Sequence, residues 1–196
     1  MVLFVLAAVS GTGKSTVGRR LRALHPKIRL SVSHTTRAPR PGEADGVDYH
    51  FVEREAFEAT IAADGFAEWA EYAGNLYGTA RSTIDAARAA GHDLLFDVEV
   101  VGAAALKAVY PDAVSCFLLP PSWEVLEARL RGRGTETEAS IHRRLATGRV
   151  EIQRAHTFDF LVTNDDLDAC VADVVTVYRA ARLRSASRLP ALASLL

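Results

Sequence analysis

A glycine-rich segment near the start of the chain carries residue types that bind phosphate groups. Residues 8–16 read Ala-Val-Ser-Gly-Thr-Gly-Lys-Ser-Thr, between an apolar run and a helical pattern. In such a loop the backbone N–H groups can surround phosphate oxygens, aided by the positive end of the following helix. Lys14 would reach the outer phosphates of a nucleotide, and the Ser15 hydroxyl would ligate Mg²⁺. The predicted phosphate site consists of Ala8, Val9, Ser10, Gly11, Thr12, Gly13, Lys14, Ser15 and Thr16.

The structural alternative is a plain glycine turn between a strand and a helix, which does not require Lys-Ser at this spacing. One residue departs from the strict pattern, because Ala8 stands where that pattern begins with glycine. Alanine is tolerated there if its φ is negative, and it costs about 1–2 kcal/mol if its backbone is left-handed. The loop indicates a nucleotide and leaves open the group to which the phosphoryl group is moved.

The elements that must position this loop follow from apolar runs that alternate with helical patterns. This alternation predicts an α/β fold with a parallel core sheet flanked by helices. Because the runs are apolar at consecutive positions, we expect the strands to be covered on both faces. The expected strands are 2–8, 28–33, 94–98, 113–119 and 160–163. The expected helices begin near Lys14, Gly102, Ser122, Thr137 and Leu167.

Two stretches interrupt this rhythm. Residues 34–90 are rich in turn residues and contain short alternating segments around 48–52 and 66–72, which predicts a small mixed α/β insertion. Residues 129–149 are dense in arginine and have few core-like positions, which predicts an exposed, mobile helical hairpin. In the hairpin, Arg131, Arg143 and Arg149 are expected to be solvated and to pair with nearby glutamates.

Composition narrows the class of protein. The 196 residues suffice for one well-cored domain, and 49% hydrophobic and 24% charged residues are close to the soluble average. A net charge of −1 gives no reason to expect nucleic acid or an acidic membrane as a partner. The apolar residues 1–8 lack a basic segment before them and are too short to span a bilayer. Cys116 and Cys170 form neither a disulfide framework nor a metal cluster, so we expect a cytoplasmic protein.

A series of motifs resembles the guanylate kinase family. The motifs occur in the family's order and cover most of the chain, from about Val5 to Leu167. Several independent motifs in order are far more specific than the phosphate loop alone. They occupy residues 31–43, 46–51, 68–71, 74–79, 97–99, 120–122, 133–136 and 164–166.

The resemblance implies a P-loop NTPase fold in three parts and an enzyme that transfers the γ-phosphoryl group of ATP to GMP or dGMP. The parts are a core (1–33, 91–128 and 150–196), a GMP-binding insertion (34–90) and a helical lid over ATP (129–149). ATP, GMP and Mg²⁺ are then the expected substrates and cofactor. The two irregular stretches found above agree with this division.

The resemblance also implies how guanine is recognised. The guanine edge offers a carbonyl beside two N–H donors, so a carboxylate can accept both donors while a hydroxyl donates to the carbonyl. By family position Glu68 is the carboxylate and Ser33 the hydroxyl, with Thr79 and Glu99 assisting. Adenine would leave Glu68 unpaired, and a polar pocket rejects such an analogue strongly. We expect Trp69, next to Glu68, and Tyr72 to be core aromatics of the insertion.

The acceptor phosphate needs cations in a fixed geometry. Arg37 and Arg40 lie three residues apart in a loop stiffened by proline, and their forked guanidinium groups suit a phosphate. The hydroxyls of Tyr49 and Tyr77 would complete the cradle. Taken alone, a Thr-Thr-Arg-Ala-Pro-Arg turn is more often a solvated loop.

On the donor side the resemblance places lid arginines over the γ-phosphate. Arg133 and Arg144 hold these positions, with Arg129 a weaker candidate. Asp97, at the end of a core strand beside the loop, would hold Mg²⁺ through water and assist at the GMP site. Asn164 is expected near the adenine, but residues 164–166 could equally be only a turn and a helix cap.

Three residues depart from the family's usual pattern. Glu99 is one methylene longer than the usual aspartate, and Val101 replaces a glutamine. Gly148 stands where alanine is usual, which predicts a loss of about 1 kcal/mol of helix stability. These departures bear on fine geometry rather than on the overall chemistry.

Two other functions are compatible with parts of the sequence. A different phosphoryl acceptor would leave Glu68 without its two donors. A non-catalytic domain that binds protein partners resembles this chain, but such domains typically lack a working phosphate loop, whereas Lys14 and Ser15 are present here.

Overall fold

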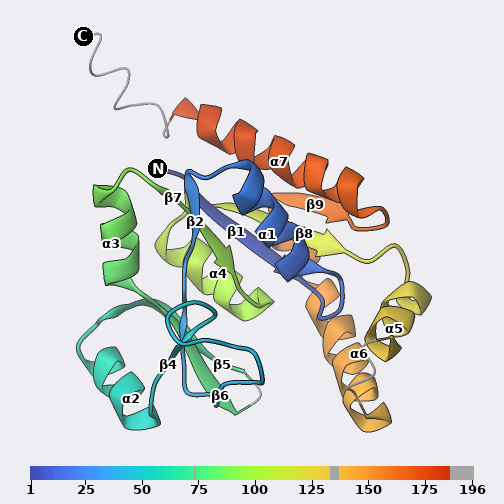
Figure 1. Ribbon diagram of the computed structural model, residues 1–196, viewed down its shortest axis with the longest axis horizontal. Coiled ribbons are helices and arrows are strands. Elements are labelled where there is room, and N and C mark those ends of the chain that lie inside the picture. Colours follow the sequence, from blue (N-terminus) through green and yellow to red (C-terminus); the bar gives the residue numbers. More distant parts are fainter. Residues whose placement is uncertain (73, 133–136, 186–196) are drawn as a thin grey trace.

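A five-stranded parallel sheet forms the centre of the computed structural model, which describes residues 1–72, 74–132 and 137–185 (Figure 1). The strands lie in the order β2-β7-β1-β8-β9. Parallel neighbours need long crossover connections, and helices supply them here. The strands are β1 (Leu3–Ala8), β2 (Ile28–Leu30), β7 (Asp93–Asp97), β8 (Val114–Leu119) and β9 (Phe160–Thr163).

Helices cover both faces of this sheet, and the alternation of side chains along β1 shows how. Phe4, Leu6 and Ala8 belong to a buried cluster with α1 and α7, whereas Val5 and Ala7 belong to a second cluster on the other face. Each fully buried side chain of the size of leucine or phenylalanine contributes about 1.5–3 kcal/mol. The helices are α1 (Lys14–Leu24), α4 (Val100–Val109), α5 (Trp123–Arg131), α6 (Glu138–Ile152), the 3₁₀ turn η1 (Ala155–Thr157) and α7 (Leu167–Leu183).

A second, smaller sheet lies at one end of the molecule (Figure 1). It is mixed, with strand order β4-β3-β6-β5, and it has its own apolar cluster of Phe57, Phe66, Leu76 and Ala80. The predicted mixed α/β insertion is thus confirmed. Its elements are β3 (His34–Thr35), β4 (His50–Phe51), α2 (Arg54–Ala62), β5 (Phe66–Tyr72), β6 (Asn75–Ala80) and α3 (Arg81–Ala89).

Helix starts follow local capping chemistry. Ser122 accepts a hydrogen bond from the N–H of Val125, Thr137 from Ser140, and Asp166 from Ala169. The predicted starts at Lys14, Ser122, Thr137 and Leu167 are confirmed to within one residue, whereas α4 begins at Val100, two residues before the predicted Gly102.

Some expectations about burial are wrong. β9 is an edge strand, and Phe160 and Leu161 are 42% and 51% exposed, because only one neighbouring strand pairs with it. Trp69 is 47% exposed rather than a core aromatic, because it alternates with the buried Glu68 along β5. The second predicted strand, 28–33, ends at Leu30.

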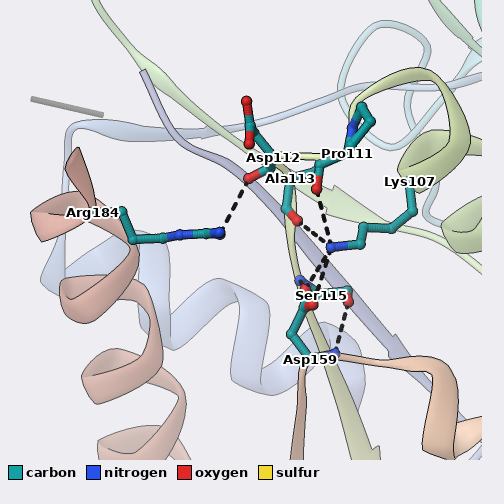
Figure 2. A network of polar contacts seen from close by, with 7 residues as sticks. All are labelled: Lys107, Pro111, Asp112, Ala113, Ser115, Asp159 and Arg184. Atoms are coloured by element: carbon teal, nitrogen blue, oxygen red, sulfur yellow. Dashed lines mark hydrogen bonds and ion pairs between the residues drawn. The ribbon is translucent and has the colours of Figure 1, made fainter. Parts of the chain in front are cut away.

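A polar network ties the N-terminal end of β8 to the chain that leads into β9 (Figure 2). The Lys107 ammonium donates to the carbonyls of Pro111 and Ala113 and to the carboxylate of Asp159. The same carboxylate accepts from the N–H and the hydroxyl of Ser115 at 2.8 Å. The Arg184 guanidinium reaches the carbonyl of Asp112. This end of the sheet is opposite the carboxyl ends of the strands, so the network serves the fold.

In the part of the chain that the structure describes, none of the helices combines the length and apolar character needed to cross a bilayer.

Candidate active site

The predicted phosphate loop lies at the carboxyl end of β1, the edge at which open parallel sheets bind ligands. Gly11 and Gly13 have φ of 98° and 101°, a conformation that side chains disfavour. The N–H of Thr12 bonds the carbonyl of Val9 at 3.1 Å and closes the turn. Among the described residues, only Asp64 is a non-glycine residue with positive φ. Ala8 therefore has ordinary backbone, and its departure from the strict pattern introduces no left-handed strain.

The loop passes directly into α1. Gly13 is the N-cap residue of this helix and makes no side-chain capping bond, so the first N–H groups are available to an anion. The positive end of the helix dipole adds to their attraction. The arrangement is that of a phosphate-binding loop.

The Lys14 side chain is held at the end of the neighbouring strand β7. Its ammonium donates to the Val98 carbonyl at 2.8 Å, lies 2.9 Å from the Asp97 carboxylate and 3.6 Å from that of Glu99. The register of β1 with β7, which pairs Leu6 with Asp97, brings these groups together. Burial lowers the pKa of Lys14, but the carboxylates of Glu99 and Asp97 outweigh burial, and the pKa stands above its ordinary value. Lys14 is therefore cationic at neutral pH.

One face of α6 lies against the loop. The Arg144 guanidinium donates to the Ser10 hydroxyl at 2.6 Å. One turn further, a Cβ on Gly148 would lie only 2.5 Å from Cγ1 of Val9. Gly148 thus lowers the helix stability but is required for packing, because the side chain of an alanine would have no room there.

Glu151 continues the same helix face and is 8% exposed. Its pKa is raised to about 7, first by burial and then by the Glu99 carboxylate, with Lys14 acting in the opposite direction. The buried carboxyl group therefore belongs to the charge cluster around Lys14.

Two further predicted residues lie on the other side of the loop. The side-chain amide of Asn164 donates to the Thr12 carbonyl at 2.6 Å. Arg129, from α5, donates to the carbonyls of Asn164 and Asp165 at 2.9 and 3.3 Å. Asp166 is the N-cap of α7, as the alternative interpretation of this turn required.

The predicted base-recognition residues meet in the smaller sheet. Glu68 on β5 pairs in register with Thr79 on β6, and the Thr79 hydroxyl donates to the Glu68 carboxylate at 2.6 Å. Burial raises the pKa of Glu68 to about 7, against the opposing effect of the Thr79 bonds. A Cβ on Gly102 would lie 3.5 Å from the carboxylate, so α4 covers it closely. The site holds a buried carboxylate with few protein donors, which suits a ligand with N–H groups.

A cationic and aromatic group includes Tyr77, which lies on β6 two residues before Thr79. The Arg37 guanidinium lies 5.4 Å from the ring centre of Tyr49, whose ring is 5.9 Å from that of Tyr77. One terminal nitrogen of Arg37 bonds both carboxylate oxygens of Glu43 at 2.9 Å. The side chain of Arg40 is exposed, and its backbone N–H donates to the same carboxylate. Both arginines lie on one loop, where they could bind the same anion.

The donors proposed for Mg²⁺ are hard oxygens, which is the ligand type this ion prefers. Ser15 lies in the first turn of α1 and is exposed, and Asp97 ends the neighbouring strand. Across 1–72, 74–132 and 137–185 there is no group of three or more His, Cys, Asp or Glu residues suited to a metal. This donor set fits an ion that arrives bound to a nucleotide.

The structure brings Lys14, Asp97 and Glu99 together, and likewise Glu68 with Thr79 and Tyr49 with Tyr77. Ser33 is half-buried, and its carbonyl accepts from His50. Arg133 lies outside the described residues. Arg131 pairs with Glu127 and Glu138, as its expected role on a solvated face requires.

Sequence reasoning missed Glu43 and Glu151. Glu43 closes the proline-rich turn only six residues after Arg37, a spacing that could have suggested the ion pair. Glu151 lies seven residues after Arg144, on the same helix face by the 3.6-residue period.

Comparisons with known proteins agree with this geometry. Residues 1–181 match the family model described as guanylate kinase. The guanylate kinase of Neisseria gonorrhoeae is 48% identical over 194 residues, covering 99% of this chain and 95% of its own. That of Thermus thermophilus is 48% identical over 184 residues, covering 93% and 83%. The crystal structure of guanylate kinase from Anaplasma phagocytophilum superposes with a TM-score of 0.78 at 31% identity, covering 94% and 87%. The predicted P-loop NTPase fold with a mixed insertion is confirmed.

The contact between α6 and the loop yields a stability prediction. Gly148→Ala should gain about 1 kcal/mol of helix propensity but lose about 1–3 kcal/mol by overpacking, because Val9 is stiff. We expect a net loss of about 1 kcal/mol in urea unfolding. The same Gly148→Ala change should cost less when it is made in a Val9→Ala background. Ala146→Gly, at an exposed position of the same helix, measures propensity alone. A stabilised Gly148→Ala single variant would contradict the packing account.

Proposed function

This chain belongs to the guanylate kinase family, and from that premise we propose that it transfers the γ-phosphoryl group of ATP to GMP, giving ADP and GDP. The observation that carries the proposal is the buried Glu68 carboxylate with its Thr79 partner, in a chain whose phosphate loop is intact. The loop accounts for the donor nucleotide. The carboxylate accounts for the choice of guanine.

For the base, we propose that Glu68 accepts the two adjacent N–H groups of guanine. The Ser33 hydroxyl would donate to the guanine carbonyl, and Thr79 would hold the carboxylate in place. Glu99 and Asp97 would assist at the edge nearest Lys14. Adenine presents no such pair of donors, so its binding would leave a charge buried and unpaired.

For the acceptor phosphate, the proposed cradle consists of Arg37, Arg40, Tyr49 and Tyr77. Arg37 and Glu43 already form an ion pair, so the phosphate would compete with that carboxylate for the guanidinium. Burial raises the pKa of Tyr49, which keeps its hydroxyl protonated as a donor at neutral pH. The cradle thus combines charge with neutral hydrogen-bond donors.

For the donor nucleotide, the N–H groups of the phosphate loop would bind the phosphates and Lys14 would reach the outer ones. Ser15, and Asp97 through water, would hold Mg²⁺. When bound, Mg²⁺ would neutralise part of the charge on the phosphates.

The chemistry requires positioning and charge neutralisation rather than a general base. A phosphate monoester has its second pKa near about 6, so the acceptor is already largely a dianion at neutral pH. Charge on the transferred group spreads over its oxygens, where Lys14, Arg37 and Arg144 would stabilise it. Arg133 is proposed for the same role on family grounds. Closure of residues 129–149 as a lid would exclude water and limit hydrolysis of ATP.

We also propose that the chain is divided into a core, a GMP-binding insertion and a lid. A reducing cytoplasm is the proposed compartment. Cys116 and Cys170 support it, because both thiols are free although both lie in the same core cluster.

The direct test is ADP formation from ATP and Mg²⁺ with GMP, AMP, CMP, UMP or dTMP offered separately. We expect turnover with GMP alone, reduced at least about a hundredfold by Lys14→Met, which removes the cation but keeps the stem. Phosphorylation of a different nucleotide would contradict the assignment of guanine. Binding of GMP without turnover would favour a non-catalytic domain.

The raised pKa of Glu68 yields a prediction about pH. The carboxylate must be ionised to accept two N–H groups, and with a pKa of about 7 its ionised fraction rises about tenfold between about pH 6 and pH 8. The KM of the wild type for GMP should fall by about that factor from about pH 6 to pH 8. This fall should be in addition to any fall that the Glu68→Gln variant shows over the same pH range. This variant keeps the shape and shares the titration of the substrate phosphate. Equal pH profiles for both proteins would exclude Glu68 as the ionising group.

A further inference from the structure

We infer that Asn164 is a positioning residue that holds the phosphate loop in its binding conformation, and that Arg129 holds Asn164 in turn. This inference rests on the proposed function and goes beyond it, because it assigns Asn164 to the phosphates of the donor nucleotide rather than to the recognition of adenine.

Asn164 is held through both its backbone and its side chain. The residue is 5% exposed, and its backbone N–H bonds the Leu119 carbonyl at 2.8 Å, which extends the pairing of β9 with β8. From this anchored position the amide nitrogen donates to the Thr12 carbonyl at 2.6 Å. The bond therefore joins the rigid edge of the sheet to the middle of the loop.

The bond to Thr12 determines where the next N–H group points. The C=O and N–H groups of a trans peptide point in opposite directions. Because the Thr12 carbonyl is turned toward Asn164, the N–H of Gly13 is turned away from it. A peptide flip would reverse that N–H group, and the hydrogen bond opposes such a flip.

Gly13 is the loop residue that packs against the Asn164 amide. A Cβ at this position would lie 2.6 Å from the amide nitrogen of Asn164, so the contact requires glycine as well as its φ of 101°. The loop and Asn164 are thus fitted to each other at the point where α1 begins.

Arg129 restrains the turn that carries Asn164. Its two terminal nitrogens donate to successive carbonyls, those of Asn164 and Asp165. A guanidinium fork suits two fixed acceptors of this kind. The restraint extends from α5 through the turn after β9 to the phosphate loop. Arg129 is the first residue of the proposed lid (129–149) and lies in the last turn of α5, which ends at Arg131. The same restraint therefore also connects the phosphate loop to the start of the proposed lid.

The test distinguishes contacts to the phosphates from contacts to the base. It measures the affinities for Mg²⁺-tripolyphosphate, ATP and GMP by calorimetry, because tripolyphosphate carries phosphates but no base. Asn164→Ala removes the brace, and Asn164→Asp keeps the shape but cannot donate. We expect both variants to lose about tenfold in affinity for tripolyphosphate and for ATP alike, with GMP binding unchanged. Arg129→Ala should weaken the same two ligands to a smaller extent. Asp165→Ala is the matched control, because Arg129 bonds only the backbone carbonyl of that residue.

The inference is overturned if ATP binding weakens while tripolyphosphate binding does not, since that pattern belongs to a contact with the base. Unchanged tripolyphosphate binding in all variants, or no tripolyphosphate binding by the wild type, would also overturn it. If Asn164→Ala does not fold, Asn164→Asp and Arg129→Ala decide the question. These measurements need no acceptor, so they are independent of whether the wild type phosphorylates GMP.

Discussion

The interaction on which the site depends is the placement of one ammonium group between two strands. Lys14 leaves the phosphate loop after β1 and meets Asp97, the Val98 carbonyl and Glu99 where β7 ends. That meeting requires β1 and β7 to be neighbours in register, which in turn requires apolar side chains on both faces of β1. The central sheet therefore holds Lys14, the one basic residue in the sequence 8–16, beside the carboxylates at the end of β7.

The carboxylates around the cations explain why the substrates would replace existing interactions in the site rather than only fill space. Glu99 lies near Lys14, Glu151 is buried on the facing helix, and Glu43 holds Arg37. The raised pKa of Glu68 and of Glu151 reflects the cost of burying carboxylates. Two anionic substrates would take over Lys14, which Asp97 and Glu99 now hold, and Arg37, which Glu43 now holds. Guanine would supply the donors that Glu68 lacks. Strongly shifted pKa values of this kind cluster at functional sites.

Local signals in the sequence were sufficient to predict much of this arrangement. The loop and the helix starts at Ser122 and Thr137 depend on short spacings. Family position assigned Glu68 and Thr79 to one site, and the structure brings the two side chains together. The burial of whole elements was harder to predict. An apolar run such as 160–163 does not reveal that β9 lies at the edge of the sheet, and the aromatic Trp69 does not reveal that it faces solvent.

What the sequence could not supply are contacts between residues distant along the chain. The fit of Gly148 to Val9 and of Asn164 to Gly13 each depends on a separation that only the packed helices define. Gly148 illustrates the point, because taken alone it predicts only a weaker helix. Its role becomes visible once α6 is seen to lie against the phosphate loop.

The most direct test of the account is a crystal structure with GMP, Mg²⁺ and a non-hydrolysable ATP analogue bound together. We expect the guanine N–H groups on the Glu68 carboxylate, the GMP phosphate on Arg37 in place of Glu43, and Lys14 moved from the Val98 carbonyl to the outer phosphates. A GMP base bound away from Glu68, or a Lys14 that stays on the Val98 carbonyl with the phosphates in place, would contradict it.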